Sequence, residues 1–318
     1  MYRILCFDGG GIRGLVTLAL LKRLEAQIPG LIKNADLLAG TSTGGIIALG
    51  LAAGKSVDDM IALYRDNGKK IFDDTWLDDM RDIGGVAGAD YDQKNLQRLL
   101  KGIFQDTRLR DLGKRVLIPS FNLDNGKPDS SKRTWNPKFF HNFPGTDSDG
   151  TDASDGDESV VNVALDTSAA PTYFPSHGTY IDGGVVANNP SMAALTQTQD
   201  PRNTDPAPAL GDIFLLSLGT GTNLSFVKGK NLDWGMAQWV KPLVNLLMDA
   251  SMGIADYQCR NILKNNYRRM APVFPPNQNI KLDDWERAPE LLAFGTNASL
   301  VDSSSGDDVV QWLTRIGW

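Results

Sequence analysis

Histidine and cysteine are scarce in this chain of 318 residues, which contains two of each. Cys6 and Cys259 lie far apart and have neither a metal-binding nor a redox spacing. Because Cys6 falls within an apolar, strand-like run, we expect it to be a buried free thiol. The two histidines, His141 and His177, are the only candidates for the base that a catalytic serine usually needs.

The chain also has no excess of positive charge and few long apolar segments. The formal net charge is −6 and the pI is near 5.0, which argues against a nucleic-acid partner and against strong attraction to anionic lipid. The N-terminus enters a strand-like run without the basic and apolar regions of a signal peptide, so a cytoplasmic location is expected, with any membrane contact peripheral and apolar. One uncharged run, residues 37–54, is as long as a membrane span, but its glycines and its Thr-Ser-Thr predict strand, turn and helix.

What the chain does contain is an alternation of short apolar strands with helical patterns. Strands are predicted at 3–8, 35–40, 115–123, 179–184 and 212–221, and helices at 15–28, 44–54, 91–104 and 161–171. A further helix, capped by Ser56 or Asp58, is predicted to run to Tyr64. This order predicts a mostly parallel sheet covered by helices. We expect a single domain over 1–318, with the motifs in 1–200 and a further strand and helices in 211–318.

Two further segments are predicted to be loops. Residues 147–158 contain six acidic side chains, but their spacing does not fit an EF-hand, so a solvated, mobile loop is expected rather than a calcium site. The aromatic-rich segment KFFHNFPG, around His141, is also predicted to be a loop.

The first motif is GGGIRG at residues 9–14, hereafter the glycine loop, which lies between a predicted strand and a predicted helix. It fits the dinucleotide fingerprint G-x-G-x-x-G, but that site also needs an acidic residue at the end of the second strand. That strand ends in Ala39-Gly40, and Asp36 lies at its start. A glycine-rich turn before a helix can instead direct N–H groups toward an oxyanion, with Arg13 adding positive charge.

The second motif is a nucleophile elbow. Residues 40–44 read Gly-Thr-Ser-Thr-Gly between a predicted strand and a predicted helix, which is the context that a G-x-S-x-G nucleophile requires. The tight turn would expose the Ser42 hydroxyl, and the flanking glycines would let neighbouring backbone pass close by. Ser42 is therefore the candidate nucleophile.

The candidate base for this serine is Asp182. It ends a predicted strand and precedes two glycines, so we expect its carboxylate at the carboxyl edge of the sheet. Burial without a cationic partner would raise its pKa from about 3.9 and make it a competent base. His177 stays an alternative, whereas Asp8 and Asp166 are expected to cap helices or fix loops.

Four motifs occur in the order found in a known family. DGGGIRG (8–14), GTSTGG (40–45), SAAPTYFP (168–175) and DGG (182–184) closely resemble the patatin-like phospholipases, from Ile4 to about Asn189. The resemblance implies a three-layer α/β/α fold with a mostly parallel central sheet, a Ser–Asp dyad in place of a triad, and no metal or cofactor. By its motifs, Ser42 would be the nucleophile and Asp182 the base. The oxyanion hole would be formed by Gly9, Gly10, Gly11 and Arg13, and the supporting turns by Gly40, Gly44, Gly183 and Gly184.

The function that this resemblance implies is a phospholipase A-type lipid acyl hydrolase, acting through an acyl-enzyme on phospholipids at a membrane surface. A general carboxylesterase or thioesterase, a nucleotide-dependent oxidoreductase and an inactive binding or storage protein are the alternatives. Within 234–254 a helical stripe is predicted to pack on the core or to form a lid or membrane-docking face; it comprises Met236, Trp239, Val240, Leu243, Val244, Leu247 and Ile254.

Overall fold

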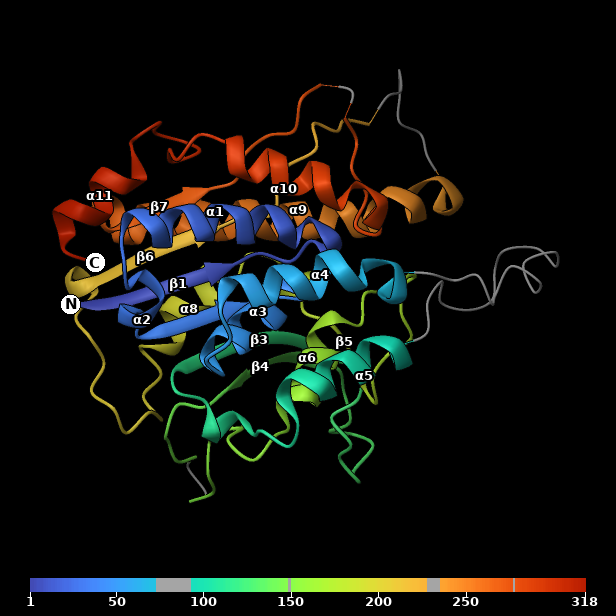
Figure 1. Ribbon diagram of the computed structural model, residues 1–318. Helices are drawn as coiled ribbons and strands as arrows, with labels where there is room; N and C mark the ends of the chain where they lie inside the picture. The colour runs from blue at the N-terminus through green and yellow to red at the C-terminus, as the bar shows by residue number, and fades with distance from the viewer. Residues whose placement is uncertain (73–92, 148–149, 228–234, 277) are drawn as a thin grey trace.

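The computed structural model describes residues 1–72, 93–147, 150–227, 235–276 and 278–318, and its element order alternates strands with helices (Figure 1). The strands are β1 Tyr2–Phe7, β2 Leu37–Gly40, β3 Arg115–Asn122, β4 Asn136–His141, β5 Tyr180–Asp182, β6 Ile213–Leu218 and β7 Tyr267–Met270. The helices of the first half are α1 Gly14–Gln27, α2 Leu31–Asn34, α3 Thr43–Ala52, α4 Val57–Ile71 and α5 Gln93–Phe104. Those of the second half are α6 Val160–Ser168, α7 Gly184–Ala187, α8 Ser191–Gln197, α9 Met236–Leu263, α10 Ala288–Asn297 and α11 Val309–Ile316.

The strands form one mixed sheet in the order β4-β3-β2-β1-β6-β7, with β5 also paired to β3. Strands β1, β2, β3, β6 and β7 run parallel, whereas β4 and β5 run antiparallel to β3. Phe7 at the end of β1 pairs with both Gly40 of β2 and Leu218 of β6. The loops that follow these three strands therefore leave the sheet at one edge, where open α/β sheets bind their ligands. The two chain ends lie together at the opposite edge (Figure 1).

Helices cover both faces of the sheet, which confirms the predicted three-layer architecture. Leu5 and Phe7 of β1 pack into the larger core with α1, α3 and α4, whereas Ile4 and Cys6 pack into a second core with α8 and α9. These side chains are fully buried, as expected of a parallel strand between two helical layers. Figure 1 shows α1 and α10 side by side within one of the layers. Cys6 is a buried free thiol, as predicted.

The predicted elements of the motif-bearing region are present, with shifted ends. The apolar run 37–54 forms β2 and α3, and α4 begins after Ser56, which makes a capping box with Asp59. Helix α4 extends to Ile71, beyond the predicted end at Tyr64. Within the described ranges no helix is long and apolar enough to cross a membrane.

Two strands were not predicted, because their sequences lack the usual pattern. The segment around His141 is not a loop: it forms β4, in which the buried His141 pairs with Leu117 of β3. Strand β7 contains two consecutive arginines, Arg268 and Arg269, yet both are buried. Burial is possible because each guanidinium forms an ion pair with an acidic side chain. The composition of this strand therefore suggests exposure to solvent, although the strand is buried.

The acidic segment 147–158 is tied to the rest of the molecule by ion pairs. Asp147 accepts a hydrogen bond from Arg202 at 3.0 Å, and the half-buried side chain of Lys138 contacts Asp155. The Asp155 carboxylate also accepts a hydrogen bond from the His141 backbone N–H at 3.0 Å. The expectation of a freely solvated segment is therefore wrong for these side chains.

The helical stripe predicted within 234–254 lies on α9, and three of its members are exposed to solvent. Leu243, Leu247 and Ile254 are 44%, 49% and 58% exposed. Among the side chains of α9 that the structure describes, the buried ones are Ala255, Cys259 and Leu263, all in its second half. The side chains of Met236, Val240 and Val244 lie outside the described ones.

Candidate active site

Ser42 lies in a strained turn between β2 and α3. Its backbone has φ 54° and ψ −123°, a conformation that residues other than glycine rarely adopt. The turn is closed by close backbone contacts: a Cβ at Gly40 would lie 2.0 Å from the Gly44 carbonyl oxygen, and one at Gly44 would lie 2.2 Å from the Phe7 carbonyl oxygen. These are the contacts that the elbow motif predicts, and they fix the Ser42 hydroxyl above the carboxyl edge of the sheet.

Asp182 reaches the same place by a route that differs from the expected one. Its strand, β5, runs antiparallel to β3, so the carboxyl end of β5 does not point to the carboxyl edge of the sheet. However, Asp182 pairs with Ser120, three residues beyond the point at which Leu117 of β3 pairs with Ala39 of β2. This register carries Asp182 past the end of β2 to the level of Ser42, and the two residues line one pocket.

The Asp182 carboxyl is buried and only partly hydrogen-bonded. Its Oδ1 accepts a hydrogen bond from the Gly184 N–H at 2.6 Å, whereas Oδ2 has no partner of hydrogen-bonding length among the described residues. Burial raises the pKa of Asp182 from 3.8 to about 6, although the Gly184 N–H and the nearby Ser42 hydroxyl act to lower it. The result is a carboxylate that is ionised near neutral pH and yet basic enough to accept a proton.

Thr167 of α6 holds the two candidate catalytic residues together, and it belongs to none of the sequence motifs. Its hydroxyl accepts a hydrogen bond from the Ser42 N–H at 3.0 Å and donates one to the Pro119 carbonyl at 2.5 Å. Its carbonyl accepts a hydrogen bond from the N–H of Gly183, next to Asp182. No local pattern signals this role, because it depends on the packing of α6 against α3.

Three residues that line the pocket have backbone N–H groups without an intramolecular partner among the described residues. They are Gly10, Gly11 and Thr43. Thr43 begins α3, so its N–H is aligned with the helix dipole. The Gly9 amide, by contrast, donates to the Asn188 carbonyl at 3.0 Å and is not available to a ligand.

Arg13 lies beside the pocket and is not among the residues that line it. Burial lowers the pKa of its guanidinium, whereas the negative charge of Asp249 on α9 raises it. The arginine therefore supplies positive charge near the glycine loop.

A buried ion pair anchors the start of the glycine loop. Asp8 directly follows β1 and is 1% exposed, and its carboxylate accepts hydrogen bonds from the Arg269 guanidinium of β7. Arg269 also donates to the Ser217 hydroxyl of β6 at 2.6 Å. Asp8 is thus a loop-fixing residue, as expected, and the partner that makes its burial possible lies 261 residues along the chain.

The alternative base, His177, is directed elsewhere. Its Nδ1 lies 2.6 Å from Oδ1 of Asp166, and it does not line the pocket that contains Ser42. Asp166 and His177 therefore form a pair that fixes the loop before β5.

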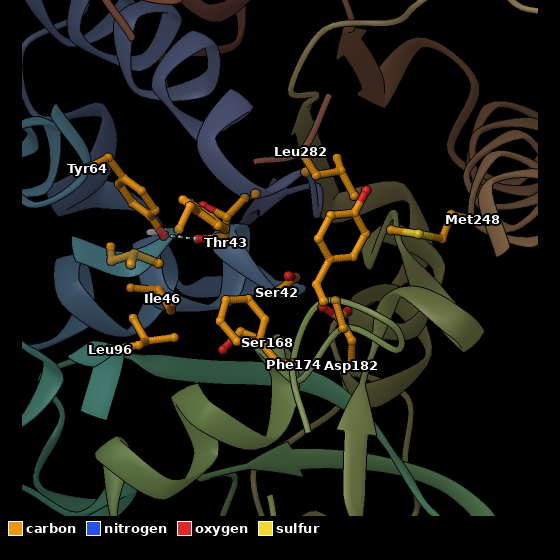
Figure 2. A pocket seen from close by; sticks show the side chains of 16 residues that line it. Ser42, Thr43, Ile46, Tyr64, Leu96, Ser168, Phe174, Asp182, Met248 and Leu282 are labelled. Atoms are coloured by element: carbon orange, nitrogen blue, oxygen red, sulfur yellow. Dashed lines mark hydrogen bonds between the residues drawn. The ribbon is translucent and has the colours of Figure 1, made fainter. Parts of the chain in front are cut away.

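The pocket around Ser42 is almost entirely apolar. Its space measures about 550 Å³, part of it open to solvent, and its lining includes Ile46, Tyr64, Ile71, Phe72, Leu96 and Phe174. Figure 2 shows Tyr64, Ile46 and Leu96 on one side of Ser42, and Asp182 and Met248 on the other. We call the part lined by these six residues the acyl pocket. The described residues contain no cluster of three side chains suited to a metal ion.

The chain is similar to known proteins of one family. The family model of the patatin-like phospholipases matches residues 5–195. A cGAMP-activated phospholipase of Pseudomonas aeruginosa is 34% identical over 308 residues, which cover 95% of this chain and 86% of the relative. The putative sporulation hydrolase CotR of Bacillus subtilis is 34% identical over 294 residues, or 92% and 78% of the two chains. Patatin-T5 of Solanum tuberosum is 26% identical over 352 residues, or 97% and 86%.

Proposed function

Since this chain belongs to the patatin-like phospholipases, a family of lipid hydrolases, we propose that it cleaves fatty-acyl esters of glycerophospholipids with Ser42 as nucleophile and Asp182 as general base. The observation that carries the proposal is the pairing of a strained, pocket-facing serine with a buried carboxyl that has a free oxygen. The pKa of about 6 suits this carboxyl to proton transfer near neutral pH.

The first half of the reaction forms an acyl-enzyme. Ser42 Oγ attacks the carbonyl carbon of the ester while Asp182 takes the hydroxyl proton. The oxyanion accepts hydrogen bonds from the amides of Gly10, Gly11 and Thr43, and Arg13 adds positive charge nearby. The bond between this carbon and the ester oxygen then breaks, and Asp182 returns its proton to that oxygen.

The second half releases the fatty acid. Asp182, now ionised again, takes a proton from water, which attacks the acyl carbon. The bond to Ser42 Oγ breaks, and the serine recovers its proton from Asp182. Both the nucleophile and the base return to their starting states, so no metal or cofactor takes part in the proposed cycle.

The apolar acyl pocket favours a long fatty-acyl chain over the small acyl groups of a general esterase. A thioesterase would need the same residues, so the two activities must be distinguished by assays on oxygen esters and on thioesters. Access to the chain requires peripheral contact with a lipid surface, which is part of the proposal.

The test is fatty-acid release from vesicles of mixed-acyl phosphatidylcholine and phosphatidylethanolamine, measured by mass spectrometry. Wild type is compared with Ser42→Ala and Asp182→Asn, each with and without cGAMP, because a relative is named a cGAMP-activated phospholipase. Release by wild type alone is expected. Equal release by Ser42→Ala would contradict the proposal. Cleavage of short soluble esters or acyl thioesters without any release from vesicles would replace phospholipids with those substrates.

A further inference from the structure

Helix α9 has a row of exposed apolar side chains along about four of its turns. The five larger ones are between 40% and 70% exposed, and the row follows one side of the helix. We call this row the α9 seam; it comprises Leu243, Leu246, Leu247, Ala250, Ile254 and Tyr257. A contiguous apolar row of this kind marks a surface that binds a partner.

The α9 seam faces away from the active-site pocket. Successive helix residues are rotated by about 100°, which places Met248, Ala255 and Cys259 on the opposite side of α9 from the centre of the seam at Ala250 and Ile254. Met248 lines the pocket, and Ala255 and Cys259 are buried. A partner on the seam would therefore support a helix that forms part of the pocket wall without covering the pocket.

The spacing within the α9 seam fits a helix as its partner. Five members of the seam, the first Leu243 and the last Tyr257, are separated by four, three, four and three residues. This is the repeat with which one helix inserts its side chains between those of another. The seam therefore predicts a second helix that lies along α9.

The charge around the α9 seam favours a protein partner over a lipid surface. Residues 243–259 contain no lysine or arginine, and their charged side chains are Asp249 and Asp256. Helices that lie on membranes are instead rich in basic residues on their polar face. The residues that flank the seam, Ser251, Gly253 and Gln258, are uncharged, so identical flanks would not repel each other.

The order of side-chain sizes along the α9 seam indicates that the partner is a second copy of this chain. The bulky residues lie toward both ends, whereas Ala250 lies at the centre and the exposed Gly253 lies nearby. In an antiparallel pair with its two-fold axis at Ala250, Leu243 lies opposite Tyr257 of the partner subunit, and Leu246 lies opposite Ile254 of the partner subunit. Large residues then meet at the ends, and the small ones let the two helices approach at the axis.

We propose that two copies of this chain associate through the α9 seam, as an antiparallel pair of α9 helices with the two-fold axis at Ala250. The proposal goes beyond the hydrolase activity and does not depend on it. Because the contact extends over about four helical turns, it is smaller than a standard interface of about 800 Å² per partner. We therefore expect a reversible dimer with a Kd on the order of micromolar.

The association is tested by analytical ultracentrifugation of the full chain at about 1–100 µM. Leu246→Lys and Ile262→Lys are matched variants, because these residues are 40% and 41% exposed on the same helix and only Leu246 belongs to the seam. Leu246→Lys and Ile254→Lys should each weaken the dimer at least about tenfold in Kd, whereas Ile262→Lys should dimerise like wild type. Circular dichroism checks that each variant is folded. A wild type that stays monomeric, or an equal loss in Ile262→Lys, would overturn the inference.

The antiparallel arrangement is tested by disulfide cross-linking. Cys6 and Cys259 are buried, so a cysteine introduced on the seam is the accessible thiol. Ala250→Cys lies at the axis and should form a covalent dimer on mild oxidation. Leu243→Cys should not, because the two copies of this residue would lie about 21 Å apart along the helix pair. Adding Tyr257→Cys to Leu243→Cys should restore cross-linking. A covalent dimer of Leu243→Cys alone, or none of Ala250→Cys, would contradict the arrangement.

Sedimentation with phosphatidylcholine vesicles separates a second copy from a lipid surface as the partner. If the α9 seam binds a second copy, Leu246→Lys and Ile254→Lys should lose dimerisation and retain whatever vesicle binding wild type and Ile262→Lys show. A monomeric wild type whose vesicle binding is lost in both seam variants would assign the seam to the lipid surface and overturn the inference.

Discussion

Replacing Asp182 with asparagine should abolish activity and at the same time stabilise the fold. The amide oxygen of the introduced asparagine would keep the acceptor for the Gly184 N–H, which donates to Asp182 Oδ1 at 2.6 Å. The other oxygen has no hydrogen-bond partner among the described residues, so no further hydrogen bond is lost there. What the substitution removes is a buried negative charge.

The magnitude follows from the pKa of Asp182, which burial raises from 3.8 to about 6. Because one pH unit corresponds to about 1.4 kcal/mol, the ionised carboxylate costs the folded state about 3 kcal/mol at pH 7. The amide N–H of the introduced asparagine would be buried without a partner, which offsets about 1 kcal/mol of this stabilisation. The expected net stabilisation by Asp182→Asn is therefore about 2 kcal/mol at pH 7.

The sign of the pH dependence is fixed by the direction of the shift. Between pH 4 and pH 6 the folded state binds more protons at Asp182 than the unfolded state does, because the pKa is about 6 in one and 3.8 in the other. The contribution of Asp182 to the wild-type free energy of unfolding therefore falls as the pH rises through this range. At pH 4 most of the destabilisation by the ionised carboxylate is absent, so Asp182→Asn should be no more stable than wild type.

The assay is urea unfolding of wild type, Asp182→Asn and Ser42→Ala at pH 4 and pH 7, followed by circular dichroism. Ser42→Ala is the control, because it is expected to be equally inactive but keeps the carboxylate. It should show no pH-dependent gain, since removing the hydroxyl leaves the pKa of Asp182 at least as high. An Asp182→Asn variant that is less stable than wild type at pH 7, or equally more stable at both pH values, would refute the reasoning.

Three further predictions rest on other contacts. Because Asp182 must be ionised to act as base, log kcat/KM should fall with a slope near one below pH about 6 and level off above it; a profile flat to pH 4.5 would contradict this. Ser42→Gly should be more stable than Ser42→Ala by about 1–2 kcal/mol in urea unfolding, because glycine relieves the backbone strain at φ 54°, and equal stability would argue against strain. Arg269→Met should lower the free energy of unfolding by about 3–5 kcal/mol by leaving Asp8 buried without its partner, and adding Asp8→Asn should recover much of the loss; no recovery would exclude this explanation.

Much of the fold follows from local sequence patterns. The parallel strands of the motif region have apolar runs bounded by glycines, and the helix after Ser56 has a capping box, so their positions are evident without a structure. Strand β7 could not be found in this way, because its two arginines are buried only through partners distant in the sequence. The sequence also does not reveal that β5 runs antiparallel and reaches the site through its register with β3.

In the candidate site, too, some residues are evident from local sequence motifs and others depend on contacts across the fold. The motifs identify Ser42, Asp182 and the glycine loop, because tight turns need glycines at fixed spacings. They do not identify Thr167, which links the two turns by hydrogen bonds across the fold. Nor do they distinguish the engaged amide of Gly9 from the free amides of its neighbours, since that depends on where the Asn188 carbonyl lies.

The central claim is that Ser42 is a nucleophile activated by Asp182, and covalent labelling with a long-chain alkyl fluorophosphonate tests it most directly. Peptide mass spectrometry should find one adduct, on Ser42, in the wild-type protein and none in Ser42→Ala. Asp182→Asn, folded and at least as stable at pH 7, should label at least about a hundredfold more slowly. An adduct on another serine, or equal labelling rates with and without the Asp182 carboxylate, would contradict the account.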